Sequence, residues 1–135
     1  MFMKKILPLS LAVMLVTFFN SCHAQEKAKW KEMEEFHNVM AQTFHPAEEG
    51  KMEPIKTRSQ EMLDKAIVWE NSTAPAGYNQ QAVKNTLKDL VKGVKEINKL
   101  IKEKAKDDVI KEKLSGLHDI FHEIMDKCEK EDHMD

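Results

Sequence analysis

Apolar residues recur every three or four positions through four stretches of this chain, and this spacing constrains the fold more than any other feature. The clearest stretch lies between residues 79 and 104, with apolar positions at Val83, Leu87, Leu90, Val94, Ile97 and Ile101. This spacing predicts an α-helix with one apolar face, packed in a left-handed bundle. The chain has only four Gly and four Pro, and aromatic residues make up 7%. Such a composition argues against a β-sandwich or a β-barrel.

We expect helices at about residues 26–44, 53–70, 79–104 and 107–132. In the first, the apolar stripe is Trp30, Met33, Met40 and Phe44, with His37 in the position between Met33 and Met40. Loops with Pro and Gly are expected at residues 45–51 and 71–78, and a short junction near residue 106. Short connections make successive helices antiparallel, so the sequence predicts an all-α, up-down-up-down antiparallel four-helix bundle.

The first 21 residues have the pattern of a signal peptide. Lys4 and Lys5 precede an apolar run over residues 6–19, which is a suitable length for a signal sequence and short for a membrane-spanning helix. We therefore expect export from the cytoplasm. Loss of the two lysines on cleavage would take the formal charge from −2 to −4.

Two cleavage sites are compatible with this signal. The segment Phe19-Asn20-Ser21-Cys22 resembles the lipobox of bacterial lipoproteins, which implies cleavage before Cys22, lipidation of its thiol and a mature domain over residues 22–135. Diacylation would give a stable anchor to a membrane in the periplasm or cell envelope. The alternative is cleavage after Ala24, which leaves a soluble exported domain. An unacylated Cys22 could instead remain and form a disulfide with Cys128.

A signal peptide followed by four such helices, with a Pro-containing loop after the second, resembles the exported cytochrome b562 and cytochrome c-prime bundles. The resemblance implies haem ligated from the last helix, with a Met from the first helix in the b-type proteins. The matching ligand types here are His118 or His122 and Met33 or Met40. The Cys-x-x-Cys-His motif that attaches c-type haem is missing around Cys128, so the resemblance implies non-covalent haem b and an electron carrier.

The histidines themselves also predict a metal site. His118 and His122 are four residues apart and leave one face of the last helix, a spacing at which two imidazoles can bind one metal ion. From the helical rise, His37 lies roughly 12 Å below the first loop, Met33 roughly 18 Å, and His118 and His122 roughly 16 and 22 Å. Because the first and last helices are neighbours, these residues are expected at about one level. Imidazole ligands suit zinc or copper, and Met33 would favour copper(I).

A second group of ligand types, His45, Glu48 and Glu49, lies in the expected loop at residues 45–51. It is the weaker metal candidate, because Pro and Gly shape such a turn and the acids favour the N-terminus of the helix that follows.

We therefore expect an exported, lipid-anchored bundle that binds a metal ion or haem between its first and last helices. The alternative is a structural or partner-binding bundle whose histidines are hydrogen-bonded, and a homodimer is compatible with either. Ser59, Ser72 and Ser115 have no nearby His and acid at a suggestive spacing, so an enzyme is not expected. The net charge of −2 does not favour nucleic acid as a partner.

Overall fold

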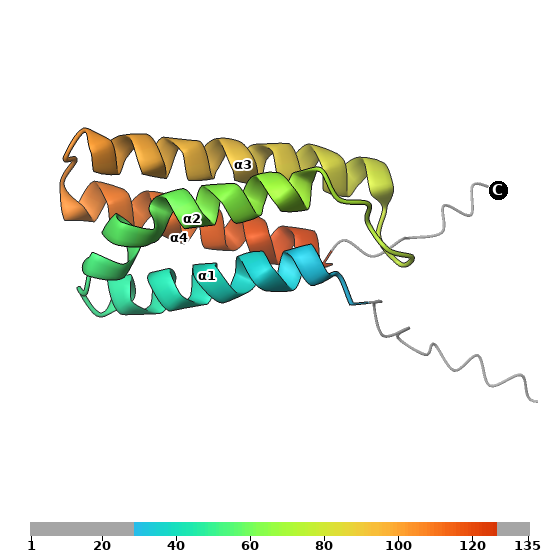
Figure 1. Ribbon diagram of the computed structural model, residues 1–135, viewed down its shortest axis with the longest axis horizontal. Coiled ribbons are helices and arrows are strands. Elements are labelled where there is room, and N and C mark those ends of the chain that lie inside the picture. The colour runs from blue at the N-terminus through green and yellow to red at the C-terminus, as the bar shows by residue number, and fades with distance from the viewer. Residues whose placement is uncertain (1–28, 127–135) are drawn as a thin grey trace, which may run out of the picture.

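The computed structural model describes residues 29–126, which form a four-helix bundle (Figure 1). Its helices are α1 (Lys31–Glu48), α2 (Glu53–Glu70), α3 (Gln80–Lys102) and α4 (Asp107–Asp126). Each helix packs on the next in sequence, α4 also packs on α1, and α1 with α4 is the least extensive of these four pairings. The predicted fold class is confirmed. The signal peptide, Cys22, Ala24 and Cys128 lie outside the described residues, as does the predicted end of the last helix.

The first helix extends further than the sequence suggested. We expected it to end near Phe44, but α1 continues through His45 and Pro46 to Glu48. A proline removes only one backbone donor, and Pro46 lies in the last turn, where Ala47 is buried and holds the helix against the core. The helix then ends in a Schellman motif: Lys51 N–H donates to the Pro46 carbonyl at 2.8 Å, and Gly50 has φ +84°.

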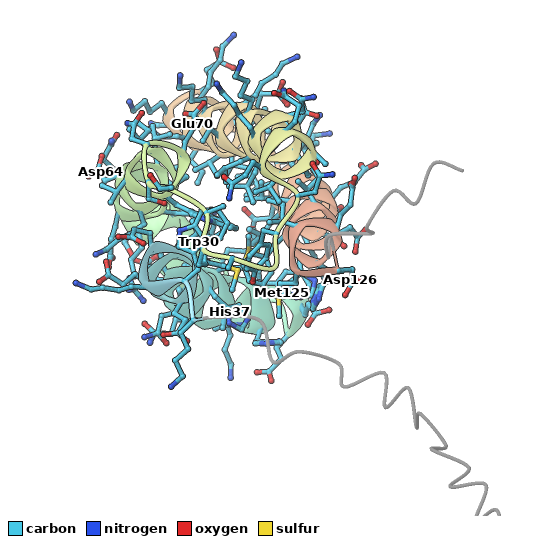
Figure 2. All side chains as sticks on the ribbon, turned by 90° about the vertical axis from the view of Figure 1, so that its right-hand side faces the viewer. Trp30, His37, Asp64, Glu70, Met125 and Asp126 are labelled. Carbon is cyan, nitrogen blue, oxygen red and sulfur yellow. The ribbon has the colours of Figure 1, made fainter. Side chains whose placement is uncertain are left out.

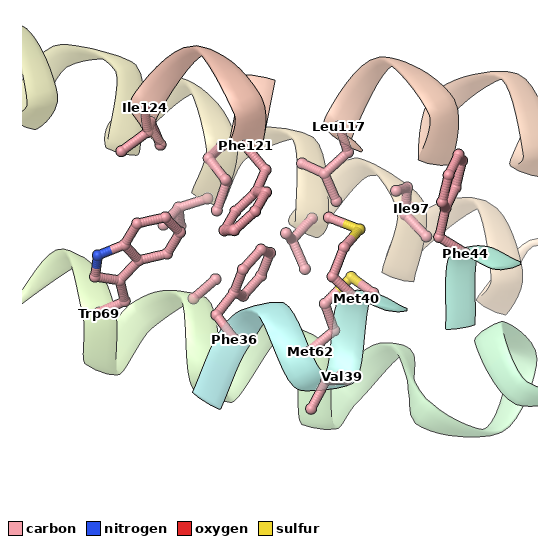
Figure 3. Close-up of a cluster of buried hydrophobic side chains, with 14 of the residues drawn as sticks. Phe36, Val39, Met40, Phe44, Met62, Trp69, Ile97, Leu117, Phe121 and Ile124 are labelled. Atoms are coloured by element: carbon pink, nitrogen blue, oxygen red, sulfur yellow. The ribbon is translucent and has the colours of Figure 1, made fainter. Parts of the chain in front are cut away.

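The bundle interior is filled by apolar side chains from all four helices (Figure 3). Phe36, Trp69 and Phe121 lie side by side in this core, with ring centroids 5.3 to 6.0 Å apart. The core face of α1 is formed by Phe36, Val39, Met40, Thr43, Phe44 and Ala47. The prediction that His37 takes a core position is therefore wrong, because Phe36 takes it and His37 lies one residue further round the helix, exposed.

Aromatic residues close the end of the bundle at which α1 begins. Trp30 packs edge-on against Trp69 and Tyr78, with centroid distances of 5.7 and 5.2 Å, and its indole N–H donates to Ser72 Oγ at 2.8 Å. Viewed from that end, Trp30 lies inside the ring of helices and His37 at the periphery (Figure 2).

The α2–α3 interface contains a buried polar pair. Ser59 Oγ donates to Asn98 Oδ1 at 2.9 Å, and Asn98 Nδ2 donates to Gln60 Oε1 at 2.9 Å. Ser59 and Asn98 are 4% and 6% exposed, so this hydrogen bond is formed away from water. Within residues 29–126, no helix combines the length and apolar character needed to cross a membrane.

Candidate metal centre

Four histidines gather along the seam between α1 and α4. His37 and His45 come from α1, and His118 and His122 from α4. His122 and His45 both lie within electrostatic range of His37 and of His118. This histidine cluster, defined as these four residues, includes every histidine that the structure describes.

The closest pair within the histidine cluster is His118 and His122. Their Nε2 atoms lie 3.2 Å apart, and their rings meet edge to face with centroids 4.4 Å apart. Two nitrogens bound to one tetrahedral zinc ion at 2.0–2.1 Å are themselves about 3.3 Å apart. In the metal-free protein, one Nε2–H can donate to the other nitrogen. The pair therefore already has the nitrogen separation of a two-histidine chelate.

Two of the histidines are held by phenylalanines of the opposite helix. His37 of α1 stacks on Phe121 of α4, with centroids 4.7 Å apart and planes at 10°. Reciprocally, His118 of α4 stacks on Phe44 of α1, at 4.1 Å and 14°. Phe44 and Phe121 are themselves buried in the core. Two histidines of the cluster therefore pack on buried aromatic side chains of the opposite helix.

These surroundings favour the neutral imidazole. Partial burial is the first cause that lowers the pKa of His37, and the charges of His122 and His45 lower it further. For His118, burial again lowers the pKa first and His122 second, while Asp119 and Glu48 oppose the shift. Neutral imidazole is the form that binds metal ions.

The predicted loop site is divided between two environments. His45 lies on the last turn of α1, and its Nδ1 is 3.4 Å from Glu48 Oε2. Its ring centroid is 6.5 Å from that of His118, so His45 joins the histidine cluster. Glu49 instead forms an ion pair with Lys51 at 3.0 Å, and the hydrogen bond from Lys51 is the main cause that lowers the Glu49 pKa.

Met33 contacts the aromatic residues at the end of the bundle where α1 begins. Its sulfur receives a hydrogen bond from Tyr78 Oη at 3.8 Å, in the aromatic end of the bundle, and its side chain packs on the core. Met40, the other methionine considered for haem, is fully buried.

The proximity of His45 to His118 was missed because a loop was expected from residue 45 onward. If the first helix is continued through Pro46, the eight-residue separation of His37 and His45 places both on the same side of it. Within residues 29–126, no three His, Cys, Asp or Glu side chains are already arranged as ligands of one ion. The structure therefore presents a two-nitrogen pair with further histidines nearby.

Comparison of the chain with protein-family models, with curated proteins and with solved structures gives no match. The resemblance to the cytochrome b562 and c-prime bundles thus extends, among these findings, to the four-helix architecture alone.

Proposed function

We propose that this protein binds a zinc or copper ion at the histidine cluster, with His118 and His122 as the chelating pair. The 3.2 Å separation of their Nε2 atoms is the observation that carries the proposal. It is close to the spacing of about 3.3 Å for two nitrogens on one tetrahedral ion. Binding an ion requires both Nε2 atoms to be free of protons and the two rings to open slightly from their centroid separation of 4.4 Å.

The position of the pair favours an exchangeable ion. His122 is exposed and His118 is partly buried, so an ion between them has coordination positions open to water or to another ligand. Imidazole nitrogen suits both zinc and copper, and in equal competition the order of metal affinities favours copper(II). The protein would thus act as a metal-binding protein, and as an electron carrier only if the ion is copper.

Haem between the helices has less support. Phe36, Met40 and Phe121 already fill the space between α1 and α4, so haem would have to displace them (Figure 3). Met33, the expected b-type ligand, is hydrogen-bonded to Tyr78 instead. A Soret band in protein purified from a haem-competent host would favour haem over a metal ion as the ligand.

The test is a titration of the purified, metal-free protein with Zn²⁺ and with Cu²⁺. We expect one ion per chain, and the double substitution His118→Asn/His122→Asn should weaken binding by at least the ~10–100-fold typical of losing an outer-shell partner. Glu112→Asn, an exposed change on the same helix, is the matched control and should leave affinity unchanged. If the wild type binds neither ion, or the double variant binds as well as wild type, the proposal is wrong and a structural or partner-binding bundle is the better interpretation.

We also propose that the protein is exported and anchored to a membrane through lipidated Cys22, on the basis of its sequence. Replacement of Cys22 by Ser should release the protein into the soluble fraction of the cell envelope. Cleavage after Ala24 predicts that this substitution has no effect on fractionation.

A further inference from the structure

His45 lies at the seam between α1 and α4, where the structure already shows contacts between the two helices without a bound ion. It lies on the last turn of α1, where the Schellman motif closes the helix. Its ring approaches His118 edge to face at 69°. The carbonyl of Glu48, in the same turn, accepts a hydrogen bond from Lys111 Nζ of α4 at 3.1 Å. The end of α1 is therefore tied to α4 through Lys111, about two helical turns before His118.

Glu48 lies beside the His45 ring, with its Oε2 3.4 Å from Nδ1. In the tautomer that carries its proton on Nδ1, the carboxylate faces this N–H and Nε2 keeps its lone pair for a ligand. Metal-binding histidines generally donate their second ring N–H to a carboxylate or a carbonyl in this way, which sets the tautomer and raises the basicity of the ligating nitrogen. His45 has a carboxylate of this kind beside it in Glu48.

The His45 ring must come closer to His118 before both can bind the same ion. Imidazoles bound to one tetrahedral zinc have ring centroids about 5 Å apart. The His118–His122 separation of 4.4 Å is somewhat shorter than this value, and the His45–His118 separation of 6.5 Å exceeds it. The His45 side chain is 65% exposed, so rotation about its own side-chain bonds can close the gap without repacking the core.

We infer that His45 supplies the third nitrogen of the site and that Glu48 is its positioning residue, so that the ion bridges α1 and α4. This inference rests on the proposed function of His118 and His122. It joins residues that the sequence assigned to two separate candidate sites. The ion would strengthen the least extensive helix pairing of the bundle, and its fourth position would remain open to water.

His37 is the alternative third ligand. Its ring lies flat on Phe121 and is held there by stacking, whereas no such contact covers His45 as closely: the Phe44–His45 centroids are 5.5 Å apart and the rings are tilted at 55°. The close ring contact of His37 is with Phe121, whereas the His45 ring faces the chelating pair directly, 6.5 Å from His118. The structure therefore favours His45.

The test counts nitrogen ligands by electron paramagnetic resonance and pulsed-EPR spectroscopy of the Cu²⁺-loaded protein. Wild type should show three imidazole nitrogens and His45→Asn two, with copper affinity reduced at least tenfold or so, while His37→Asn retains three. Glu48→Gln should keep three nitrogens but bind ~10-fold or more weakly, Glu48→Asp should restore part of the affinity, and Glu49→Gln is the matched control.

Three outcomes would overturn the inference: an unchanged spectrum and affinity in His45→Asn, loss of a nitrogen in His37→Asn, or equal effects of Glu48→Gln and Glu49→Gln. Failure of the proposed function differs from these, because the wild type would then bind no copper at the histidine cluster. Circular dichroism of the metal-free variants should match wild type, since His45 and Glu48 are exposed and outside the core.

Discussion

The imidazole of His37 in α1 lies flat on the phenyl ring of Phe121 in α4, with centroids 4.7 Å apart and planes at 10°. His37 is exposed overall, yet this contact covers one face of its ring. The loss of hydration disfavours the charged form, and the pKa of His37 therefore lies below the ordinary value of 6.5. His118, stacked on Phe44, has a lowered pKa for the same first reason.

Acidification should destabilise the metal-free protein through these two histidines. Their folded-state pKa values are lower than those of the unfolded chain, so the unfolded chain binds more protons below about pH 6.5. Above about pH 6.5, these two histidines should leave the free energy of unfolding unchanged. As the pH falls below about 6.5, the free energy of unfolding should decrease. NMR titration of the imidazole protons should give midpoints below 6.5 for both residues.

Urea unfolding at a series of pH values, with His37→Asn/His118→Asn beside wild type, measures the effect on stability. The double variant should lose stability less steeply between about pH 7 and pH 5. Midpoints above 6.5, or identical pH profiles for the two proteins, would contradict the prediction.

The sequence predicts the bundle well because each helix has a repeated apolar face, and in α3 every position of the expected stripe except Ile101 is buried. It does not resolve a rotation of one residue in α1, where Met33 and Trp30 suggested a stripe through His37. Phe36 and Phe44 are larger and more apolar than His37 and occupy the core positions, so His37 lies at the edge of the core face. The sequence predicts that His118 and His122 share one face, because they are four residues apart in one helix. The proximity of His45 to His118 depends on where α1 ends, which the sequence did not predict.

Gly116 should be replaceable by Ala with a gain in stability. Gly116 lies within α4, and a Cβ there would meet no atom within 4 Å. Gly116→Ala should raise the free energy of unfolding by about 0.5–1 kcal/mol, the cost of glycine in a helix. Gly93 is the matched position, because its Cβ would lie 3.0 Å from Leu117 Cδ1. Gly93→Ala should gain less than Gly116→Ala in chemical denaturation, and the reverse order would count against this packing.

Replacing Lys104 by glycine should stabilise the protein. The end of α3 repeats the Schellman pattern of α1: Ala105 N–H donates to the Leu100 carbonyl at 2.9 Å, and Lys104 has φ 55°. A left-handed conformation costs a residue with a Cβ roughly 1–2 kcal/mol, so Lys104→Gly should stabilise by up to about 1 kcal/mol after its entropic cost. Gly50→Ala, at φ +84°, should destabilise by a similar amount. Thermal unfolding of the two variants checks the opposite signs, and a shared sign would refute the argument.

The Ser59–Asn98 hydrogen bond should show strong coupling between its two residues. Ser59→Ala leaves the buried Asn98 Oδ1 without its donor, which should cost about 1–3 kcal/mol. Replacing both residues, as Ser59→Ala/Asn98→Leu, removes the unsatisfied group and should cost less than the sum of the single changes. Gln60→Ala is the control, since Gln60 is exposed and water can replace it. Additive effects in this double-mutant cycle would show that the bond contributes nothing specific.

Metal binding and folding should be linked at the histidine cluster. An ion held by His118 and His122 and joined by His45 exists only in the folded bundle, so zinc at 100 times its dissociation constant should stabilise the protein by ~2.7 kcal/mol. Excess EDTA should reverse the shift in the unfolding midpoint, and His118→Asn/His122→Asn should abolish it. His45→Asn should reduce it, because the ion would no longer bridge the least extensive helix pair. Equal zinc-induced shifts in wild type and in the double variant would mean that zinc binds elsewhere on the chain.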